Sequence, residues 1–331
     1  MQSLLSPGQY ARRMFFMNAG CAHDARDSVD RAYVERLRSL VEGMNGGKRQ
    51  GVKLLLFAFD RTHDERGEPD LGRTGFYVPD AYARDIAARY PDYFEWVASI
   101  HPYRPDAQEA VEKARREGAR AVKWLPSAMA IDPLSSRCGK FYEAMKKAGL
   151  PLISHAGEER AVPGAGAHDY SNPLRLRRAL DAGVRVVIAH CASLGEDRDL
   201  DRGANGPYVE SFALFSRLFD DPKYQRLLFG DISAITQINR AGPALVRVIE
   251  EQAWHARLLN GSDYPLPGVM PLFSVQYLVS LKLLEEKAAP ILTEIRRRNP
   301  LLFDFVLKRH LRSNGNALAT GVFETRPFFM R

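Results

Sequence analysis

The chain has 331 residues, 45% of them hydrophobic, with a formal net charge of +7 and a pI of about 9.3. This length suits one α/β barrel with insertions, and no Pro/Ser-rich linker or low-complexity tract divides it. The basic residues are scattered among acidic neighbours and form no stripe interleaved with aromatic residues, which argues against a nucleic-acid partner. No apolar run approaches the length of a transmembrane helix, so no membrane partner is expected.

Cysteine usage and the first residues indicate a cytoplasmic protein. Cys21, Cys138 and Cys191 form no CxxC pair and leave one cysteine over from any disulfide pairing, which is typical of a reducing compartment. Residues 1–7 lack the charged segment and the long apolar stretch of a secretory signal. The expected organisation is a single domain, 1–331, made of N-terminal helices, a barrel and a tail: 1–50, 51–311 and 312–331.

Two helices are predicted before the first strand. They cover Gly8 to Met17 and Asp27 to Met44, and the second carries an apolar stripe at helical spacing. The turn Gly46-Gly47-Lys48 lacks the full pattern of a phosphate loop and is interpreted as a plain turn. The first clear strand, Lys53 to Phe59, leads into a polar insertion, Arg61 to Thr74.

Strands and helices then alternate along the chain. Seven strands are predicted, which end near Asp60, His101, Lys123, His155, His190, Asp231 and Asp263. Three of the intervening helices are closed by Gly118, Gly149 and Gly183, which recur about every 30 residues, as one strand, one helix and their loops require.

Strict alternation implies a parallel sheet, and seven strands are one short of a closed eight-stranded barrel. An open doubly wound sheet would carry a glycine-rich nucleotide turn after its first strand, and none is present. The fold class predicted is therefore α/β, a (β/α)8 TIM-type barrel whose first strand is missing.

The later part of the chain contains a long acidic loop, Gly195 to Gly206, which we interpret, together with Arg61 to Thr74, as a lid over the site. The arginine run 296–298 before Asn299-Pro300 is interpreted as a solvated helix end. Helices are expected across 209–219, 242–251, 272–287 and 290–311.

Polar residues follow the predicted strands at equivalent positions. The carboxyl ends of the strands in a parallel barrel share one face, so these side chains should meet there. They are His101, Lys123, His155, His190, Asp231 and Asp263. Neutral imidazoles and a carboxylate are the ligands that zinc prefers, and a catalytic zinc site needs about three protein ligands and an open position for water. Asp263 could take the proton from that water.

Each of these residues also has a structural interpretation. A single histidine at a strand end is more often a hydrogen-bonded structural residue, and Lys123 alone could be a salt-bridged side chain. Asp231 and Asp263 could cap the helices that follow them. The repetition at equivalent positions favours a site. His101, which precedes Pro102, could be a turn residue, and His23 and His63 are expected on surface loops. Glu158 and Glu159 are loop carboxylates that either meet a substrate or face water.

Four segments carry a resemblance to the amidohydrolase superfamily, in particular to its amidohydrolase-related branch of metal-dependent (β/α)8 hydrolases and related decarboxylases. They are Ala121-Val122-Lys123, Ile153-Ser154-His155-Ala156-Gly157, Ile188-Ala189-His190-Cys191 and Asn260-Gly261-Ser262-Asp263-Tyr264-Pro265. The resemblance implies that His155 and His190 bind metal, that Asp263 is a further ligand and the general base, and that Lys123 holds the position carboxylated in binuclear members. It implies one or two divalent ions, zinc or alternatively manganese.

The chain departs from that family at one point. Members open with a strand that ends in His-X-His, and no such motif occurs here. Two explanations stay open: the sequence begins after that strand, which we prefer, or the protein is a natural variant that lacks two ligands. An open barrel seam would expose strand edges and favour a homo-oligomer.

The expected function is hydrolysis of an amide, ester or lactone of a small molecule by metal-activated water. One alternative is a lyase on the same scaffold that decarboxylates or hydrates an acid, whose carboxylate Arg104 and Arg240 would bind. Another is a metal-poor barrel without activity. The residues expected to contact the substrate are His101, Arg104, Glu158, Glu159 and Arg240.

Overall fold

The computed structural model describes residues 14–15, 17–20, 28–46, 51–162 and 165–330. The chain forms two compact units, each assembled from three segments. The first unit comprises Met1–Lys53, Thr236–Gln252 and Gly261–Leu318, and the second comprises Leu54–Ile235, Ala253–Asn260 and Ala319–Arg331. The single domain expected from the sequence stays a prediction, and the predicted helix at Gly8 to Met17 and the turn at Gly46 to Lys48 lie largely outside the described residues.

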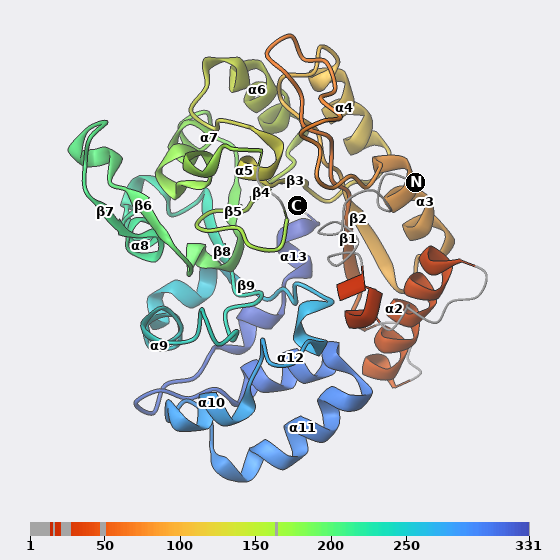
Figure 1. The fold of residues 1–331 in the computed structure, drawn as a ribbon, viewed down its shortest axis with the longest axis vertical. Coiled ribbons are helices and arrows are strands. Elements are labelled where there is room, and N and C mark those ends of the chain that lie inside the picture. The colour runs from red at the N-terminus through yellow and green to blue at the C-terminus, as the bar shows by residue number, and fades with distance from the viewer. Residues whose placement is uncertain (1–13, 16, 21–27, 47–50, 163–164, 331) are drawn as a thin grey trace. The chain divides into compact units, whose positions relative to one another are not determined.

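The second unit contains all seven predicted strands, in parallel pairs and in chain order. They are β1 (Leu54–Phe57), β2 (Phe94–Val97), β3 (Val122–Trp124), β4 (Leu152–Ser154), β5 (Val186–Ile188), β8 (Leu228–Asp231) and β9 (Leu258–Leu259). β1 pairs with β2, an isolated parallel bridge from Ala98 to Val122 leads to β3, and each later strand pairs with the next. Figure 1 shows these strands along one arc, with the helices outside it.

One apolar cluster fills the inside of this arc. It contains residues from six of the strands, together with Ala121, which directly precedes β3, and Phe328 of the short helix α13 (Arg326–Phe329). The residues from the strands are Leu55, Phe57, Val97, Ile153, Val187, Phe229 and Leu259. Because residues from β1 and β9 share this cluster, the two ends of the strand series enclose a common interior, as in a barrel.

The helices of the second unit alternate with the strands as predicted. They are α3 (Asp80–Arg89), α4 (Ala107–Arg116), α5 (Pro126–Met129), α6 (Gly139–Ala148), α7 (Arg177–Asp181) and α8 (Ser211–Asp220). Gly118, Gly149 and Gly183 all have left-handed backbone angles, with φ of 85°, 67° and 85°. Since a side chain is disfavoured there, glycine ends each helix and lets the chain turn back into the next strand.

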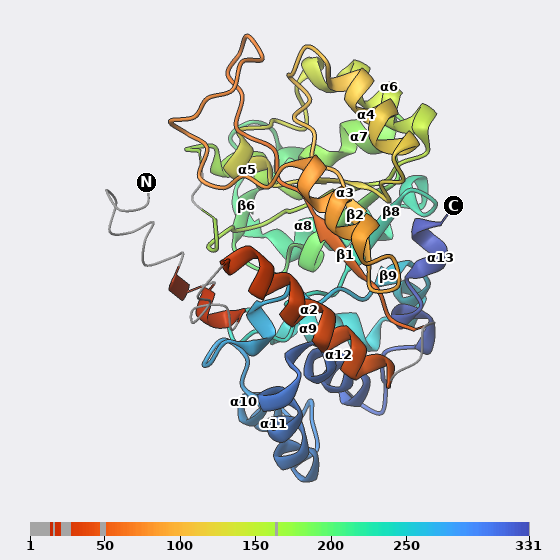
Figure 2. The same ribbon diagram turned by 90° about the vertical axis from the view of Figure 1, so that its right-hand side faces the viewer.

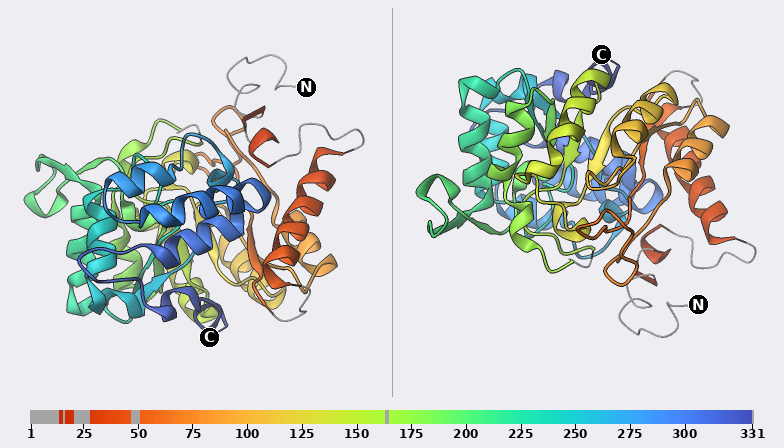
Figure 3. Two further views of the ribbon diagram at one scale, coloured as in Figure 1. Left: turned by 90° about the horizontal axis from the view of Figure 1, so that it is seen from below. Right: turned by 90° about the horizontal axis from the view of Figure 1, so that it is seen from above.

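The segment Gly195 to Gly206 is not an open loop, which corrects the sequence interpretation. It contains β6 (Glu196–Arg198), which pairs antiparallel with β7 (Tyr208–Glu210). The hairpin projects from the second unit (Figure 3). Arg217 binds Asp199 at 2.7 Å, and an ion pair between Arg177 and Asp201 adds a second anchor. Acidic residues of this segment therefore bind arginines of α7 and α8, and its role as a lid stays a prediction.

The first unit is helical in the residues that the structure describes. It contains α2 (Val29–Asn45), α9 (Pro243–Glu250), α10 (Val275–Ser280), α11 (Ala289–Arg298) and α12 (Pro300–His310), and Figure 2 shows α2 beside α12. The predicted helix end after the arginine run is confirmed: α11 stops at Arg298, and the Asn299 side chain accepts the N–H groups of Leu301 and Leu302. The helix expected across 272–287 is shorter, at Val275–Ser280.

Candidate active site

His155 follows β4 and lies inside the second unit. Its side chain is 2% exposed, and its Nδ1 lies 3.4 Å from Oε2 of Glu159. The other oxygen of Glu159 accepts the backbone N–H groups of Ala161 and Val162. Burial alone would raise the pKa of Glu159, but the charges of His155 and Lys123 and these two hydrogen bonds lower it below its usual value. Glu159 is thus an anion that orients His155.

His190 lies at the end of β5, in a run of left-handed residues. His190, Cys191 and Ala192 have φ of 57°, 51° and 47°, which is rare for residues with a side chain and reverses the chain sharply after the strand. Gly230 of β8 permits this turn, because a Cβ there would lie 2.9 Å from Sγ of Cys191. The turn brings the ring of His190 to 5.5 Å from the ring of His155, at an interplanar angle of 66°.

Ser233 and Asp231 hold the ring of His190. Nδ1 of His190 lies 3.0 Å from the carbonyl oxygen of Ser233 and 2.9 Å from its hydroxyl oxygen. The hydroxyl of Ser233 donates to Oδ2 of Asp231 at 3.0 Å, while Oδ1 of Asp231 accepts the backbone N–H of Ser233. Asp231 therefore closes a short turn onto Ser233, and it does not cap a following helix.

Lys123 occupies the inner face of β3. Its register partner is Ile153, which belongs to the interior cluster, and its side chain is buried. Its ammonium lies 5.7 Å from the ring centre of Phe57, and its charge contributes to the lowered pKa of Glu159. Lys123 and His155 thus act on the same anion, Glu159, and the ring of His190 lies beside that of His155. Carboxylation of Lys123 stays a prediction.

Asp263 and Arg240 belong to the first unit. Asp263 has a left-handed backbone, with φ of 55°. Burial first, and then the charges of Tyr264 and Asp263, raise the pKa of Tyr33 in the same unit. The convergence of Asp263 with His155 and His190, and the substrate contact of Arg240, stay predictions.

His101 is buried and engaged within the protein. Its Nε2 lies 2.9 Å from the carbonyl of Met129, and its backbone N–H donates to Asp60. Burial lowers the pKa of His101 to about 3, so this ring stays neutral. His63 is also buried, which corrects its assignment to the surface: its ring lies 4.8 Å from that of His101, at an interplanar angle of 39°.

Arg104 and Glu158 are bound to neighbouring side chains. The guanidinium of Arg104 binds Asp60 at 2.9 Å and Asp106 at 2.7 Å. Glu158 pairs with Arg160 near the surface, at 2.8 Å. The segment Arg61 to Thr74 is likewise fixed to its surroundings, since the hydroxyl of Thr62 donates to Ala128 O and Arg137 donates to Glu65 O.

Sequence reasoning missed Ser233 and the role of Asp60. Ser233 carries a recognisable signal, because an aspartate two residues before a serine favours a side-chain turn directly after a strand. The sequence pattern identifies Asp60 only as the residue at which the first strand ends. Its carboxylate receives Arg104 and the backbone of His101, and it lies 3.8 Å from His63, so it organises the buried polar cluster beside β1 and β2.

Two imidazoles of this site suit a divalent ion. In metal sites the ring nitrogen that does not bind the ion usually donates to a carboxylate or a carbonyl, as the Nδ1 atoms of His155 and His190 are placed to do. That leaves Nε2 of each ring as the ligating atom. Among the described residues, however, no group of three or more His, Cys, Asp or Glu side chains is arranged to hold an ion. The described residues therefore supply two metal ligands, His155 and His190, together with the contacts that orient them.

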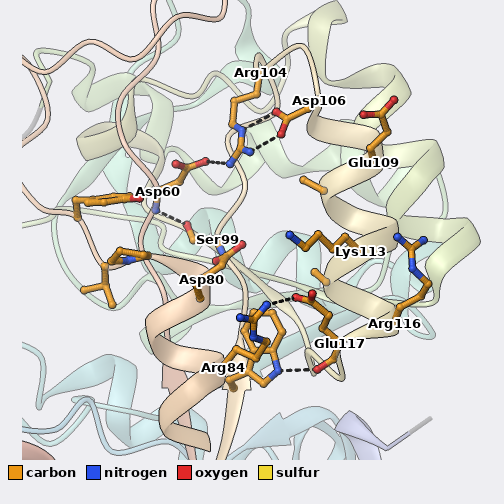
Figure 4. A pocket seen from close by; sticks show the side chains of 17 residues that line it. Asp60, Asp80, Arg84, Ser99, Arg104, Asp106, Glu109, Lys113, Arg116 and Glu117 are labelled. Atoms are coloured by element: carbon orange, nitrogen blue, oxygen red, sulfur yellow. Dashed lines mark hydrogen bonds and ion pairs between the residues drawn. The ribbon is translucent and has the colours of Figure 1, made fainter. Parts of the chain in front are cut away.

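A separate cavity of about 470 Å³ lies between α3 and α4 (Figure 4). Arg104, between Asp60 and Asp106, closes one end, and the ion pair of Arg84 with Glu117 closes the other. Asp80 lies on its wall, where Oδ1 accepts the backbone N–H of Ser99 at 2.8 Å. Burial raises the pKa of Asp80 to about 6. Arg84 and Arg104 are thus paired with carboxylates of the wall, and we assign no ligand to this cavity.

Asp80 predicts a pH-dependent stability. Its pKa is higher in the folded protein than the ordinary value of 3.8, so the folded state loses stability relative to the unfolded state as the pH rises from about 4 to about 6. Asp80→Asn retains the acceptor for Ser99 and removes the charge. We expect it to stabilise the protein by about 1–3 kcal/mol at pH 7.5 and to give no gain at pH 3.5. Denaturant unfolding at both values measures this, with the exposed Asp92→Asn as the control; an equal effect at both pH values would contradict it.

No helix among the described residues is long and apolar enough to cross a membrane. Residues 54–300 match the family described as Amidohydrolase, and the chain belongs to that family. The prediction of an α/β fold of TIM-barrel type, with parallel strands alternating with helices, is confirmed. The chain matches none of the curated proteins.

Three solved structures illustrate the likeness. An uncharacterized TIM-barrel protein from Bordetella bronchiseptica is 19% identical, with a TM-score of 0.49 and coverage of 89% of this chain and 92% of that one. A proposed 2-pyrone-4,6-dicarboxylic acid hydrolase from Pseudomonas putida is 16% identical, with a TM-score of 0.43 and coverage of 84% and 98%. A 5-carboxyvanillate decarboxylase from Novosphingobium aromaticivorans, complexed with manganese, is 11% identical, with a TM-score of 0.42 and coverage of 75% and 67%.

Proposed function

We propose that this chain is a hydrolase of the amidohydrolase family that cleaves an amide, ester or lactone bond of a small molecule. The observation that carries the proposal is the pair of buried imidazoles, His155 and His190, whose rings lie 5.5 Å apart and whose Nδ1 atoms both face protein acceptors. Two rings fixed in this way present their Nε2 atoms, which suits metal binding or proton transfer.

In this proposal His155 and His190 would hold a divalent ion, zinc or manganese, with Asp263 as a further ligand and Lys123 beside them. When bound, such an ion would supply a water of lowered pKa, about 7, and Lewis-acid polarisation of the scissile carbonyl. The residues of the chain do the remaining work. Glu159 fixes His155, Ser233 fixes His190, and Asp263 accepts the proton of the attacking water and passes it to the leaving group.

Hydrolysis is proposed ahead of decarboxylation because of Arg104. The lyase alternative assigns Arg104 and Arg240 to a substrate carboxylate, but the guanidinium of Arg104 is already bound by Asp60 and Asp106, and Asp60 is 8% exposed. Arg104 is 25% exposed, and releasing it to a substrate would leave the buried carboxylate of Asp60 without this cation, which is unfavourable.

Metal analysis with a substrate panel tests this proposal. The full-length protein is dialysed against metal-free buffer, and zinc and manganese are measured by mass spectrometry. Esters, lactones and amides are assayed for acid release and aromatic acids for carbon dioxide release. We expect at least one bound ion per chain, and hydrolysis that a chelator abolishes and added zinc or manganese restores. Carbon dioxide release alone would favour the lyase, and turnover that resists chelation without any bound metal would refute the metal assignment.

A further inference from the structure

The contacts around His190 determine which of its ring nitrogens carries the proton. The carbonyl oxygen of Ser233 can only accept a hydrogen bond, and it lies 3.0 Å from Nδ1. An unprotonated Nδ1 at that distance would place two lone pairs against each other. The hydroxyl of Ser233 has one proton, and it lies 3.0 Å from Oδ2 of Asp231 and 2.9 Å from Nδ1. A carboxylate is the stronger acceptor, so the hydroxyl donates to Asp231 and offers a lone pair to His190.

We infer that Asp231, acting through the hydroxyl of Ser233, is a positioning residue that keeps the proton of His190 on Nδ1 and so leaves the lone pair on Nε2. The inference rests on the proposed function for its catalytic consequence, since His190 is the residue that it serves. The two residues in contact at the ring are buried: His190 is 7% exposed and Ser233 is 3% exposed, while Asp231 is partly buried. Water therefore has little access to replace either partner.

An asparagine at position 231 should reverse the direction of the hydrogen bonds between residue 231, the hydroxyl of Ser233 and Nδ1 of His190. Oδ1 of Asp231 accepts the backbone N–H of Ser233, so an asparagine must place its oxygen there and its NH₂ group toward the hydroxyl. The opposite orientation would set two donors against each other. The hydroxyl then accepts from the amide and turns its own proton toward Nδ1 of His190. A hydrogen bond from that hydroxyl favours a proton on Nε2, in competition with the carbonyl of Ser233, which still favours a proton on Nδ1. A proton on Nε2 removes the lone pair from the side that faces the reaction.

The test combines two substitutions with a spectroscopic readout. Histidine ¹⁵N shifts distinguish the two tautomers, and they are recorded on the full-length, chelator-treated protein, with His190→Asn to assign the signals. We expect protonated Nδ1 in the natural protein and in Ser233→Ala, which keeps the carbonyl at position 233. Asp231→Asn should shift the ring toward protonated Nε2. The double variant, Asp231→Asn with Ser233→Ala, should again have a protonated Nδ1. It lacks the Ser233 hydroxyl through which the change at position 231 reaches the ring.

Turnover provides a second readout in the metal-loaded protein. We expect Asp231→Asn to lower kcat by about 10–100-fold with little change in KM, and Ser233→Ala in the same chain to recover most of that loss. Asp197→Asn and Ser216→Ala are matched controls. Asp197 is a buried aspartate that binds a serine hydroxyl at 2.7 Å, and Ser216 is buried in α8. Both should leave the His190 signals unchanged.

Two results would overturn the inference: Asp231→Asn with Nδ1 still protonated, or a double variant with the same tautomer as Asp231→Asn. A structural role alone would make the two losses of kcat additive. If the tautomer moves as expected while turnover is unaffected, the inference about Asp231 stands and the role proposed for His190 is wrong. Thermal unfolding of each variant identifies any that fails to fold.

Discussion

Replacing His190 by alanine is expected to lower kcat by about 10²–10⁴-fold, because the substitution removes one of the two oriented imidazoles on which the proposed chemistry depends. His190 is 7% exposed and is held through Nδ1 by Ser233, so no solvent-borne group can easily take its place. Bound metal should fall in parallel if Nε2 of this ring is a ligand. Initial rates and metal content of the purified variant measure both effects.

The backbone at His190 requires a second variant. Its φ of 57° is unfavourable for alanine and better tolerated by asparagine, so His190→Asn separates loss of the imidazole from loss of the turn. His168→Ala is the control, since this side chain is exposed and its substitution should leave the rate unchanged. Full activity in both His190 variants, with normal unfolding, would remove this residue from the site.

Removing the carboxylate of Asp304 is expected to destabilise the first unit more than any surface substitution. Lys308 is fully buried, and its ammonium donates to Asp304 and to the carbonyl of Gly261, at 2.7 Å each. Asp304→Ala leaves the lysine charge buried with only a carbonyl as partner. Such a change typically costs about 3–5 kcal/mol, which should lower the melting temperature by on the order of 10 °C.

Glu294→Ala is a control with the same geometry. Glu294 and Arg298 form a pair of the same i,i+4 spacing, at 2.8 Å, but both side chains are at least half exposed. Its loss should cost no more than about 0.5 kcal/mol. The double variant Asp304→Leu with Lys308→Met should recover much of the stability, since the uncompensated charge is removed. Calorimetry on the natural protein, the two single variants and the double variant measures these stabilities. Equal losses of stability for Asp304→Ala and Glu294→Ala would show that the buried pair contributes little.

The strand series was predictable because each strand is a short apolar run followed by a polar residue. All seven runs became parallel strands, and Gly118, Gly149 and Gly183 ended their helices as expected. The hairpin of β6 and β7 was not predictable in this way. Glu196–Arg198 has no apolar alternation, and the hairpin is held by ion pairs to Arg177 and Arg217, which are distant in sequence.

The candidate site was only partly predictable. A histidine after a buried strand can be recognised from its neighbours, and the structure places His155 and His190 side by side. The same pattern makes His101 a candidate, yet this ring binds Met129 and lies beside Asp60 in a structural cluster. The hydrogen-bond partners of a histidine determine whether it belongs to the site or to a structural cluster. Partners such as Ser233 follow another strand, which the sequence around the histidine does not identify.

The position of Phe328 late in the chain affects when the interior of the second unit can be completed during synthesis. This side chain packs among residues from β1 to β9, so the ring that completes their shared core leaves the ribosome after every strand has been made. Until then the nascent chain holds an unfinished apolar interior, which is the state most exposed to aggregation or to chaperone capture. Folding of the second unit is therefore expected to finish only once this aromatic residue has emerged.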